Sequence, residues 1–457
     1  MGAVPKAVQR VGRVMPVGGI VEPNSRGAGR YRAVTRVDDV VRHIYWIAFA
    51  VRVLAGIGGY IATEHFAVPL LQDALYYEQV GYGVAQDWLS GRSSQWLDTE
   101  EYGGRVAWLM VAIIGGLYFL LQGLRSVPIL LMLWSLLTAW VPTYTYWIAM
   151  EVGATPTVSR RAAWIVALAP AFVFWSGALY KEGLVLLILS IGAYHTLRLQ
   201  RQWRAGSLLA VILSIGALLG LRFYLAPLMG GAIVIGLLFA RDVHATKRKI
   251  GGNVVAFVRQ TTLAVVFVVA MVFMGFAERS EEALFESDAG LLMQLDITRR
   301  DLAAAQSGYH PGADVSAPED AIRFFPIGLL YFLTVPLPWQ FGGLRQTLTI
   351  PETLAWVLSY PFVLVGIVRG LRVNRSGTAF LVILTAAICG VYAVLSGNVG
   401  TAYRMRTQVW LFWAPFAVWG WEVWRGRHRT PREAVGREVR YATAGRQSVR
   451  GLVKRRT

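Results

Sequence analysis

The chain has few of the residues and motifs on which soluble enzymes depend. It holds one cysteine, Cys389, and six histidines, and charged residues make up 16% of its 457 positions. A single cysteine can form no intrachain disulfide, and its place inside an apolar run is typical of a small packing residue. The CxxC, HExxH, Walker A and GxSxG arrangements are missing, so nothing indicates a zinc protease, a P-loop or a serine hydrolase.

Long apolar runs are abundant instead. Hydrophobic residues make up 55% of the chain, and its mean hydropathy is +0.47. A helix needs about 20 apolar residues to cross the hydrocarbon core of a bilayer, and many runs here approach that length. The sequence therefore predicts an all-α, polytopic membrane protein.

The net charge of +18 comes mostly from the two ends of the chain. Residues 1–43 carry eight Lys and Arg against three acids, and residues 424–457 carry eleven against two. Basic segments that flank membrane spans mark the cytoplasmic side and attract anionic lipid headgroups. We therefore predict two basic, flexible cytoplasmic tails that contact membrane lipids, and no nucleic-acid partner.

The acidic residues gather in two other stretches. Residues 63–104 hold seven acids against one arginine, and residues 277–325 hold ten against four arginines. The positive-inside rule places such stretches outside. We predict two large external loops that carry short helices, 63–126 and 277–352, with both termini cytoplasmic.

About ten spans follow within a single transmembrane domain, 44–423. The predicted spans are 44–62, 127–149, 162–179, 183–199, 206–221, 224–240, 257–276, 353–370, 377–396 and 405–423. Two further apolar stretches, 105–122 and 325–338, do not fit as full spans if both termini are cytoplasmic and the acid-rich loops are external. We expect them to dip into the outer leaflet. Counting both as spans gives twelve and moves Arg160 and Arg161 to the outside, which the charge rule disfavours.

A charged pair, Lys181 and Glu182, separates two of the apolar runs. An ionisable group in or near the bilayer core costs a few kcal/mol, so such groups are candidates for a functional site. The alternative is a solvated turn between two helices.

The first external loop contains a carboxylate, Asp73, followed at helical spacing by Tyr76 and Tyr77. A carboxylate can accept the proton of an attacking hydroxyl, and aromatic rings can pack on a sugar or a prenyl chain. This pattern suits a sugar site. The alternative is an interfacial amphipathic helix with a tyrosine anchor and a solvated Asp73.

Several arginines lie at expected external junctions. Arg404 and Arg406 follow Tyr403 at the entry to the last span, and Arg222 lies at another junction. Arginines beside an apolar run are costly unless they bind anions, and the guanidinium group matches phosphate oxygens. They are candidates for phosphate binding, and the alternative is snorkelling to lipid headgroups.

The order of these parts resembles the GT-C superfamily of membrane glycosyltransferases, which includes polyprenyl-phosphate-sugar-dependent mannosyl- and aminoarabinosyltransferases. The resemblance covers residues 44–200, with a looser echo at 398–406. It rests on an acidic D-A-x-x-Y-like motif at Asp73, a short basic turn before 162–179, and an external acid at Glu182. Each motif is weak alone, and their order along the chain carries the resemblance.

The resemblance implies an inverting glycosyltransferase with its active site on the outer face of a bacterial plasma membrane. It would move a sugar from a polyprenyl-phosphate donor to a lipid- or glycan-linked acceptor. In this hypothesis Asp73 is the general base, and Glu182 positions the acceptor or shares the base role. The residues expected to bind the phosphate or the substrate are Arg404, Arg406, Arg222, Lys181, Tyr76, Tyr77 and Tyr403. The first loop lacks the DxD pair of some metal-dependent relatives, so no cofactor is expected, and a role for a divalent metal stays open.

Two other functions stay open. A polysaccharide polymerase or O-antigen-ligase-like enzyme would use an undecaprenyl-diphosphate-linked glycan, with residues 277–325 covering the site. A transporter or non-catalytic assembly subunit belongs to a different class. Transporters usually bury charges at mid-membrane on broken helices and often contain repeats, and the sequence pattern indicates neither.

Overall fold

The protein is helical throughout the part of the chain that its structure, a computed structural model, describes. The described residues are 26–66, 71–94, 104–202, 204–238, 290–305, 307–337, 339 and 344–427. Within these ranges no β-strand forms, and one isolated bridge pairs Gly308 with Asn398. The predicted all-α class is confirmed for these residues. The chain divides into two compact units, Met1–His43 and Ile44–Thr457, and everything below concerns the second.

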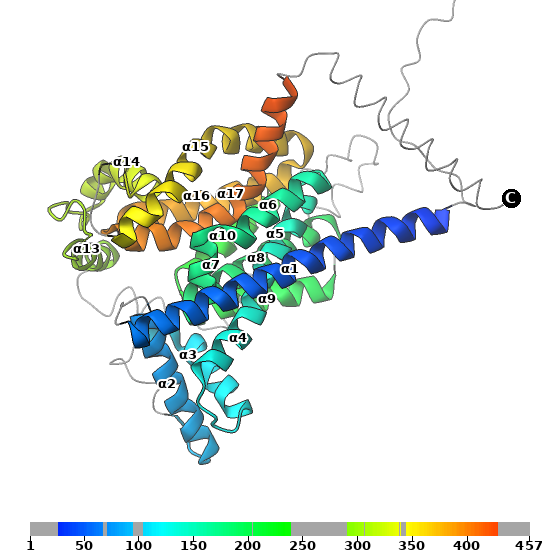
Figure 1. The fold of residues 1–457 in the computed structure, drawn as a ribbon. Helices are drawn as coiled ribbons and strands as arrows, with labels where there is room; N and C mark the ends of the chain where they lie inside the picture. The colour runs from blue at the N-terminus through cyan, green and yellow to red at the C-terminus, as the bar shows by residue number, and fades with distance from the viewer. Residues whose placement is uncertain are drawn as a thin grey trace, which may run out of the picture. The chain divides into compact units, whose positions relative to one another are not determined.

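The helices keep the labels of Figure 1. They are α1 (Arg26–His65), α2 (Gln72–Leu89), α3 (Gly104–Leu120), α4 (Val127–Thr138), α5 (Trp140–Glu151), α6 (Pro156–Leu168), α7 (Pro170–Gly177), α8 (Lys181–Arg201), α9 (Ala205–Leu221), α10 (Leu225–Leu238), α13 (Gly290–Ala303), α14 (Pro318–Thr334), α15 (Leu344–Val373), α16 (Arg375–Leu395) and α17 (Val399–Arg427).

Several of these helices are long and apolar enough to cross a membrane, as expected for a membrane protein. By length and composition the described residues contain five such segments: Asp39–His65, Val127–Glu151, Lys181–Arg201, Gln346–Val373 and Arg375–Leu395. A sixth is added if α6 and α7, which meet at a bend of 57°, form one broken span. The predicted count of about ten is therefore not reached on these criteria.

The other predicted spans have different outcomes. Two of them, 206–221 and 224–240, correspond to the shorter helices α9 and α10, and 405–423 lies within α17, which carries four arginines. The stretches expected to dip into the outer leaflet, 105–122 and 325–338, contribute to α3 and α14. The predicted span 257–276 and most of both predicted tails lie outside the described residues.

A proline break shapes the region before Lys181. Thr155 caps α6 by accepting a hydrogen bond from Val158 N at 3.3 Å, and Pro156 occupies the first turn, where its missing N–H costs nothing. Helix α6 therefore includes Arg160 and Arg161, which were expected in a turn. Pro170 ends α6, because the residue before a proline is pushed out of the helical region of backbone space. The short helix α7 follows at the new angle.

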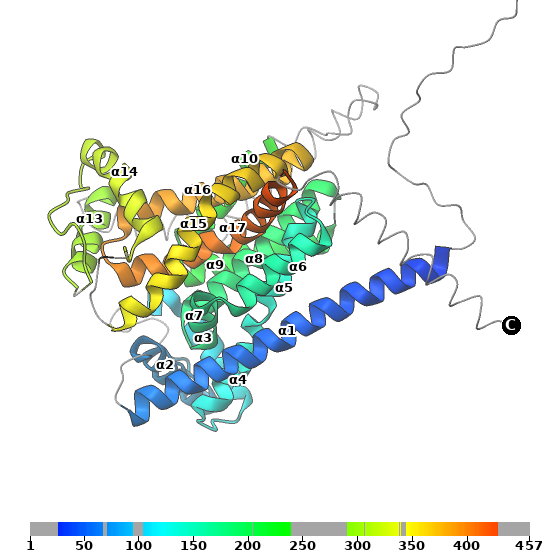
Figure 2. The same ribbon diagram turned by 45° about the horizontal axis from the view of Figure 1, so that its top comes forward.

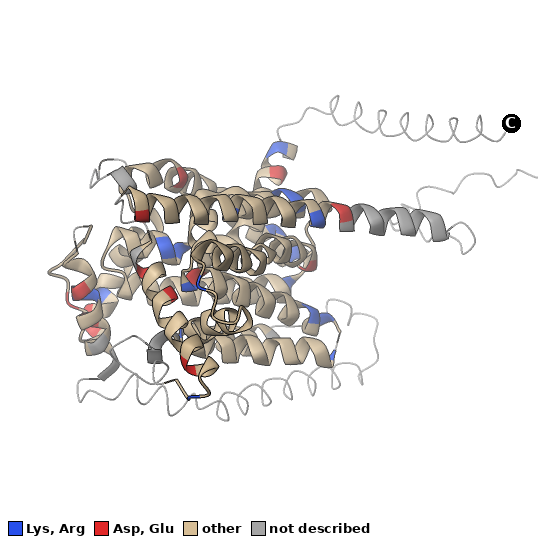
Figure 3. Cartoon of the chain, turned by 60° about the horizontal axis from the view of Figure 1, so that its bottom comes forward, with Lys and Arg blue, Asp and Glu red and all other residues tan. Residues whose placement is uncertain are grey.

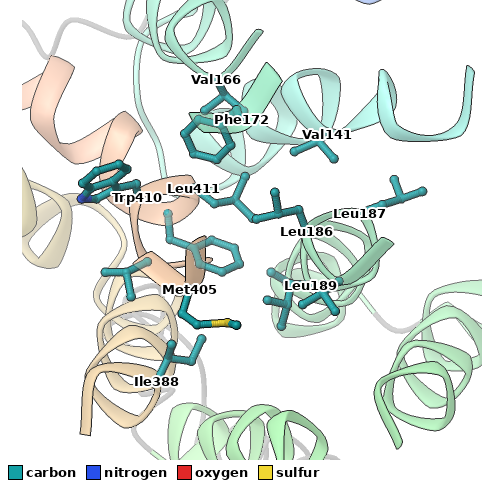
Figure 4. Close-up of a cluster of buried hydrophobic side chains, with 14 of the residues drawn as sticks. Val141, Val166, Phe172, Leu186, Leu187, Leu189, Ile388, Met405, Trp410 and Leu411 are labelled. Atoms are coloured by element: carbon teal, nitrogen blue, oxygen red, sulfur yellow. The ribbon is translucent and has the colours of Figure 1, made fainter. Parts of the chain in front are cut away.

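The core of the second unit lies around α8 and α17. Helix α8 packs against α5 and α9, and α17 packs against α15 and α6. Figure 4 shows Leu411 of α17 close to Leu186 of α8, with Met405 and Ile388 nearby. All four side chains are nearly inaccessible. This packing fixes the first turns of α8 and α17, which carry the charged residues described next.

Helix α2 packs against α3 and lies near the C-terminal end of α1 (Figure 2). Charged residues are sparse on the described helices (Figure 3), so the few that gather at one place stand out.

Candidate functional site

A buried carboxylate, Glu182, is the centre of a charged cluster. It is the second residue of α8 and only 1% exposed. Its Oε1 accepts a hydrogen bond from Arg222, which follows the last residue of α9. The same oxygen lies 3.4 Å from Nε of Arg404 on α17. A helix N-terminus also favours a negative side chain, so burial of this charge is well compensated.

Arg404 links this buried carboxylate to an accessible one. Its Nη1 lies 3.6 Å from Oδ2 of Asp73, in the first turn of α2. The side chain of Asp73 is 66% exposed, whereas that of Arg404 is 23% exposed. The arginine thus bridges two acids that are more than a hundred positions apart in sequence, and one of them is free to meet a ligand from solvent.

The cluster has an excess of positive charge. Lys181, directly before Glu182, is partly buried and interacts electrostatically with Glu182, Arg222, Arg404 and Asp73. With Lys181 protonated, three cations face two carboxylates, which is a formal charge of +1. Oε2 of Glu182 and Nε of Arg222 are buried and have no hydrogen-bond partner among the described residues. The free Nε–H of Arg222 suits an acceptor oxygen of an anion, whereas Oε2 of Glu182 suits a donor such as a hydroxyl group.

A chain of hydrogen bonds holds Arg222 in place. Its Nη1 donates to the hydroxyl of Tyr224 at 2.6 Å, and that hydroxyl lies 3.2 Å from the hydroxyl of Tyr392. Tyr392 donates to Oε1 of Gln408 at 3.1 Å, so Tyr224 is left to donate to Tyr392. Gln408 lies one helical turn after Arg404, on the same side of α17. One face of α17 thus carries Arg404 and, through Gln408 and the two tyrosines, also holds Arg222 in place.

Aromatic side chains border the cluster. Tyr77 follows Asp73 by one turn; burial raises the pKa of its hydroxyl, and the nearby Glu182 carboxylate raises it further. The guanidinium carbon of Arg404 lies 5.7 Å from the ring centroid of Trp175, within cation–π range. Tyr76 is 40% exposed and lies elsewhere on α2, beside a cavity described below.

The structure does not bring Arg406 and Tyr403 into this cluster. Arg406 is fully buried, donates to the carbonyl of Val335 and lies 5.1 Å from the ring centroid of Trp410. No described carboxylate lies within ion-pair distance of it, and its Nε and Nη1 have no partner among the described residues. Tyr403 donates to Oε2 of Glu352 on α15.

Arg52 of α1 is a buried cation whose role the sequence pattern does not reveal. Pro170 has no N–H for the carbonyl of Val166, and the N–H of Ala171 donates to Glu352 instead of the carbonyl of Ala167. Arg52 donates to both of these carbonyls, at 3.4 and 3.3 Å, and to the Ser176 hydroxyl at 2.7 Å. Its position inside an apolar run was the available signal.

Close backbone contact reinforces this crossing of α1 and α7. A Cβ atom on Gly177 would lie 2.7 Å from the carbonyl oxygen of Arg52, and a Cβ on Gly56 would collide with the carbonyl of Gly177. Only glycine permits such an approach. Arg52 and these glycines therefore set the position of α7, which carries Trp175 and leads into Lys181.

Across the described residues no group of three or more His, Cys, Asp or Glu is arranged to hold a metal ion. A comparison with protein-family models finds no match for the chain, and neither does a search of curated proteins. The chemistry of the cluster itself is therefore the basis for a functional proposal.

Proposed function

We propose that the protein is an integral membrane glycosyltransferase that moves a sugar from a polyprenyl-phosphate donor to a lipid- or glycan-linked acceptor. The observation that carries this proposal is the position of Arg404 between an exposed carboxylate, Asp73, and a buried one, Glu182. A base that solvent can reach lies beside a cluster with excess positive charge. A transferase with an anionic leaving group needs both.

In the proposed reaction each charged residue of the cluster has one role. Asp73 accepts the proton of the acceptor hydroxyl, whose oxygen attacks the anomeric carbon as the bond from that carbon to the phosphate oxygen breaks. The polyprenyl phosphate leaves with the bonding electrons, and Arg404 and Lys181 neutralise its charge. Glu182 orients Arg404 and Arg222. Attack from the side opposite the phosphate inverts the anomeric carbon.

The proposal includes the membrane arrangement expected from charge. We place the cluster at the outer face of a bacterial plasma membrane, with about ten spans and both termini in the cytoplasm. In this arrangement the broken pair α6–α7 and the helices α9, α10 and α17 join the five long helices as spans, and the tenth span is 257–276, which lies outside the described residues. The accessible Asp73 and the acid-rich stretch around it then face the outside.

Two observations favour other functions. Three cations suit a diphosphate as well as a monophosphate, as expected for a polymerase or ligase. The broken pair α6–α7 with buried Arg52 is a feature of transporters. However, Arg52 is bonded to groups at the break itself, so its charge stabilises the break and is not left for a substrate.

Ligand-dependent thermal stability tests the proposal. Purified protein is titrated with polyprenyl monophosphate, polyprenyl diphosphate and phosphatidylglycerol, as wild type, Arg404→Gln and the control Arg323→Gln, whose side chain is 82% exposed. We expect the monophosphate to raise the melting temperature most, and Arg404→Gln alone to remove the effect. Preference for the diphosphate would favour the polymerase or ligase. Equal responses to all three lipids would refute a specific phosphate site.

A further inference from the structure

A cavity of about 730 Å³ lies beside α2, outside the charged cluster. Tyr60 and Glu64, one turn apart on α1, form one wall, and Tyr76 and Gln79 of α2 form another. The first residues of α4 close a third side. Nothing in the proposed reaction uses this cavity, although its volume is large enough for a sugar ring with substituents.

The back of the cavity is a saturated ion pair. Glu78 is 2% exposed and accepts hydrogen bonds from Arg125 at 3.0 and 2.8 Å and from the hydroxyl of Tyr118 at 2.7 Å. Arg125 also lies over the ring of Tyr82, 4.9 Å from its centroid. Glu78 therefore balances the charge of Arg125, whose side chain is 47% exposed.

The remaining charge in the cavity is negative. Glu64 is exposed and forms no ion pair with any described residue. With Glu78 and Arg125 cancelling, the lining has a formal charge of −1. It also offers the rings of Tyr60 and Tyr76 and the amide of Gln79. This combination repels phosphate and favours hydroxyl groups, apolar sugar faces and amines.

The cavity is adjacent to the proposed base. Residues three apart on a helix have Cβ atoms about 5–6 Å apart, so Tyr76 is a direct neighbour of Asp73. Gln79 continues the cavity face one turn further along α2. Asp73 and Tyr77 lie on the side of α2 that meets Glu182 and Arg404. Helix α2 thus separates a cationic site from an acidic, aromatic one, with Asp73 beside both.

We propose that this cavity binds a sugar ring of the acceptor, either neutral or carrying an amine, and excludes the phosphate of the donor. A role for this cavity in catalysis rests on the proposed transferase function, in which the bound sugar presents a hydroxyl group to Asp73. Sugar binding itself does not depend on that function. The cationic cluster and the cavity would then take the two substrates from opposite sides of α2.

Protection of an introduced thiol tests this inference without an assay of transfer. Gln79→Cys is made in a Cys389→Ala background, and its rate of maleimide labelling is measured in nanodiscs. Methyl glucoside, glucosamine and glucose phosphate are the probes, and neutral glucosyl-diacylglycerol in the nanodisc tests whether a lipid headgroup supplies the same chemistry. Ser90→Cys, at the exposed far end of α2, is the matched control.

We expect methyl glucoside and glucosamine to slow labelling at Gln79→Cys and not at Ser90→Cys. Glucosyl-diacylglycerol in the nanodisc should have the same effect. At a concentration about ten times the dissociation constant, occupancy slows labelling about tenfold. Glu64→Gln should weaken protection by glucosamine more than by methyl glucoside. Absence of labelling, absence of protection, or equal protection by glucose phosphate would each overturn the inference. If sugars protect the thiol but polyprenyl phosphate does not raise the melting temperature, the transferase proposal would be refuted and the sugar-binding inference would stand.

Discussion

Arg404 and Arg406 are separated by one residue and lie on different sides of α17. Arg404 contacts Asp73 and Glu182, whereas Arg406 contacts the carbonyl of Val335 and the ring of Trp410. Positions two apart on a helix differ by about 200° in direction, so the two guanidinium groups cannot hold the same phosphate. Arg404 therefore faces the charged cluster, whereas Arg406 is enclosed by the core.

The first prediction follows from that division. Arg406→Met should change the free energy of unfolding by less than about 2 kcal/mol, because losing an incompletely paired buried charge offsets the loss of its single protein hydrogen bond. The variant should keep the stabilisation by polyprenyl phosphate, which a thermal titration measures. Loss of the lipid response with the fold intact would place the phosphate at Arg406 instead.

Asp73→Asn should reduce sugar transfer by about 10²–10⁴-fold, because a positioned base contributes that much. Its side chain is 66% exposed, so the melting temperature should stay near that of the wild type. Donor consumption in proteoliposomes gives the rate. Asp320→Asn, which changes an acid whose side chain is 44% exposed and which lines neither the cluster nor the cavity, controls for the loss of one negative charge. Activity within a few-fold of the wild type would remove Asp73 from the mechanism.

The ion pair of Glu182 and Arg222 should behave as a coupled unit. Removing one partner of a buried pair costs about 3–5 kcal/mol, and we expect Arg222→Met to lie near the lower end because Glu182 keeps Arg404 at 3.4 Å. The double variant Glu182→Leu with Arg222→Met should regain more than half of the loss. Unfolding in detergent mixtures measures the cycle, and additive effects would show that the pair is not coupled.

Sequence reasoning located most of the cluster because charge beside apolar runs is costly. Lys181, Glu182, Arg222 and Arg404 were singled out for that reason, and Asp73 was singled out for the tyrosines that follow it at helical spacing. The structure brings all five together. The all-helical class followed from composition. The alternative of a solvated turn does not hold for Glu182, which is 1% exposed within α8. Arg222, for which snorkelling was the alternative, is 7% exposed and pairs with Glu182.

Other features had no signal in the sequence. The count of about ten spans stays a prediction, because apolar runs such as those of α9 and α10 form helices of 17 and 14 residues, shorter than the roughly 20 residues that a crossing takes. The link from Arg222 through Tyr224 and Tyr392 to Gln408 joins three distant segments, and no spacing rule reports such tertiary contacts. Arg52 was visible as a charge in an apolar run, but its partners at the Pro170 break depend on the crossing of α1 and α7.

Arg52→Met should lower the free energy of unfolding by about 2–5 kcal/mol, because two buried carbonyl groups at the break lose their donor. The control is Leu54→Ala, on the same helix and 73% exposed, which should change stability by less than about 0.5 kcal/mol in the absence of core contacts. Denaturation followed by tryptophan fluorescence compares the two. Equal, small effects would show that the break is stable without Arg52.

His310 should make stability depend on pH. Burial lowers the pKa of its imidazole, and the charge of Arg299 lowers it further. The ring faces Tyr331 of α14 at 4.4 Å between centroids, with Tyr309 and Phe324 also close. The unfolded chain therefore takes up a proton first as pH falls below about 6.5, so this contribution is constant above that pH and lost below it.

Each pH unit by which the folded pKa lies below the unfolded one removes about 1.4 kcal/mol at low pH. His310→Asn should abolish this part of the decline, and asparagine tolerates the positive φ of 47° at that position. Melting temperatures of both proteins between pH 5 and 8 give the comparison, and the carboxylates that also titrate cancel in the difference. Parallel curves would mean that the imidazole is protonated as readily in the folded protein as in the unfolded chain.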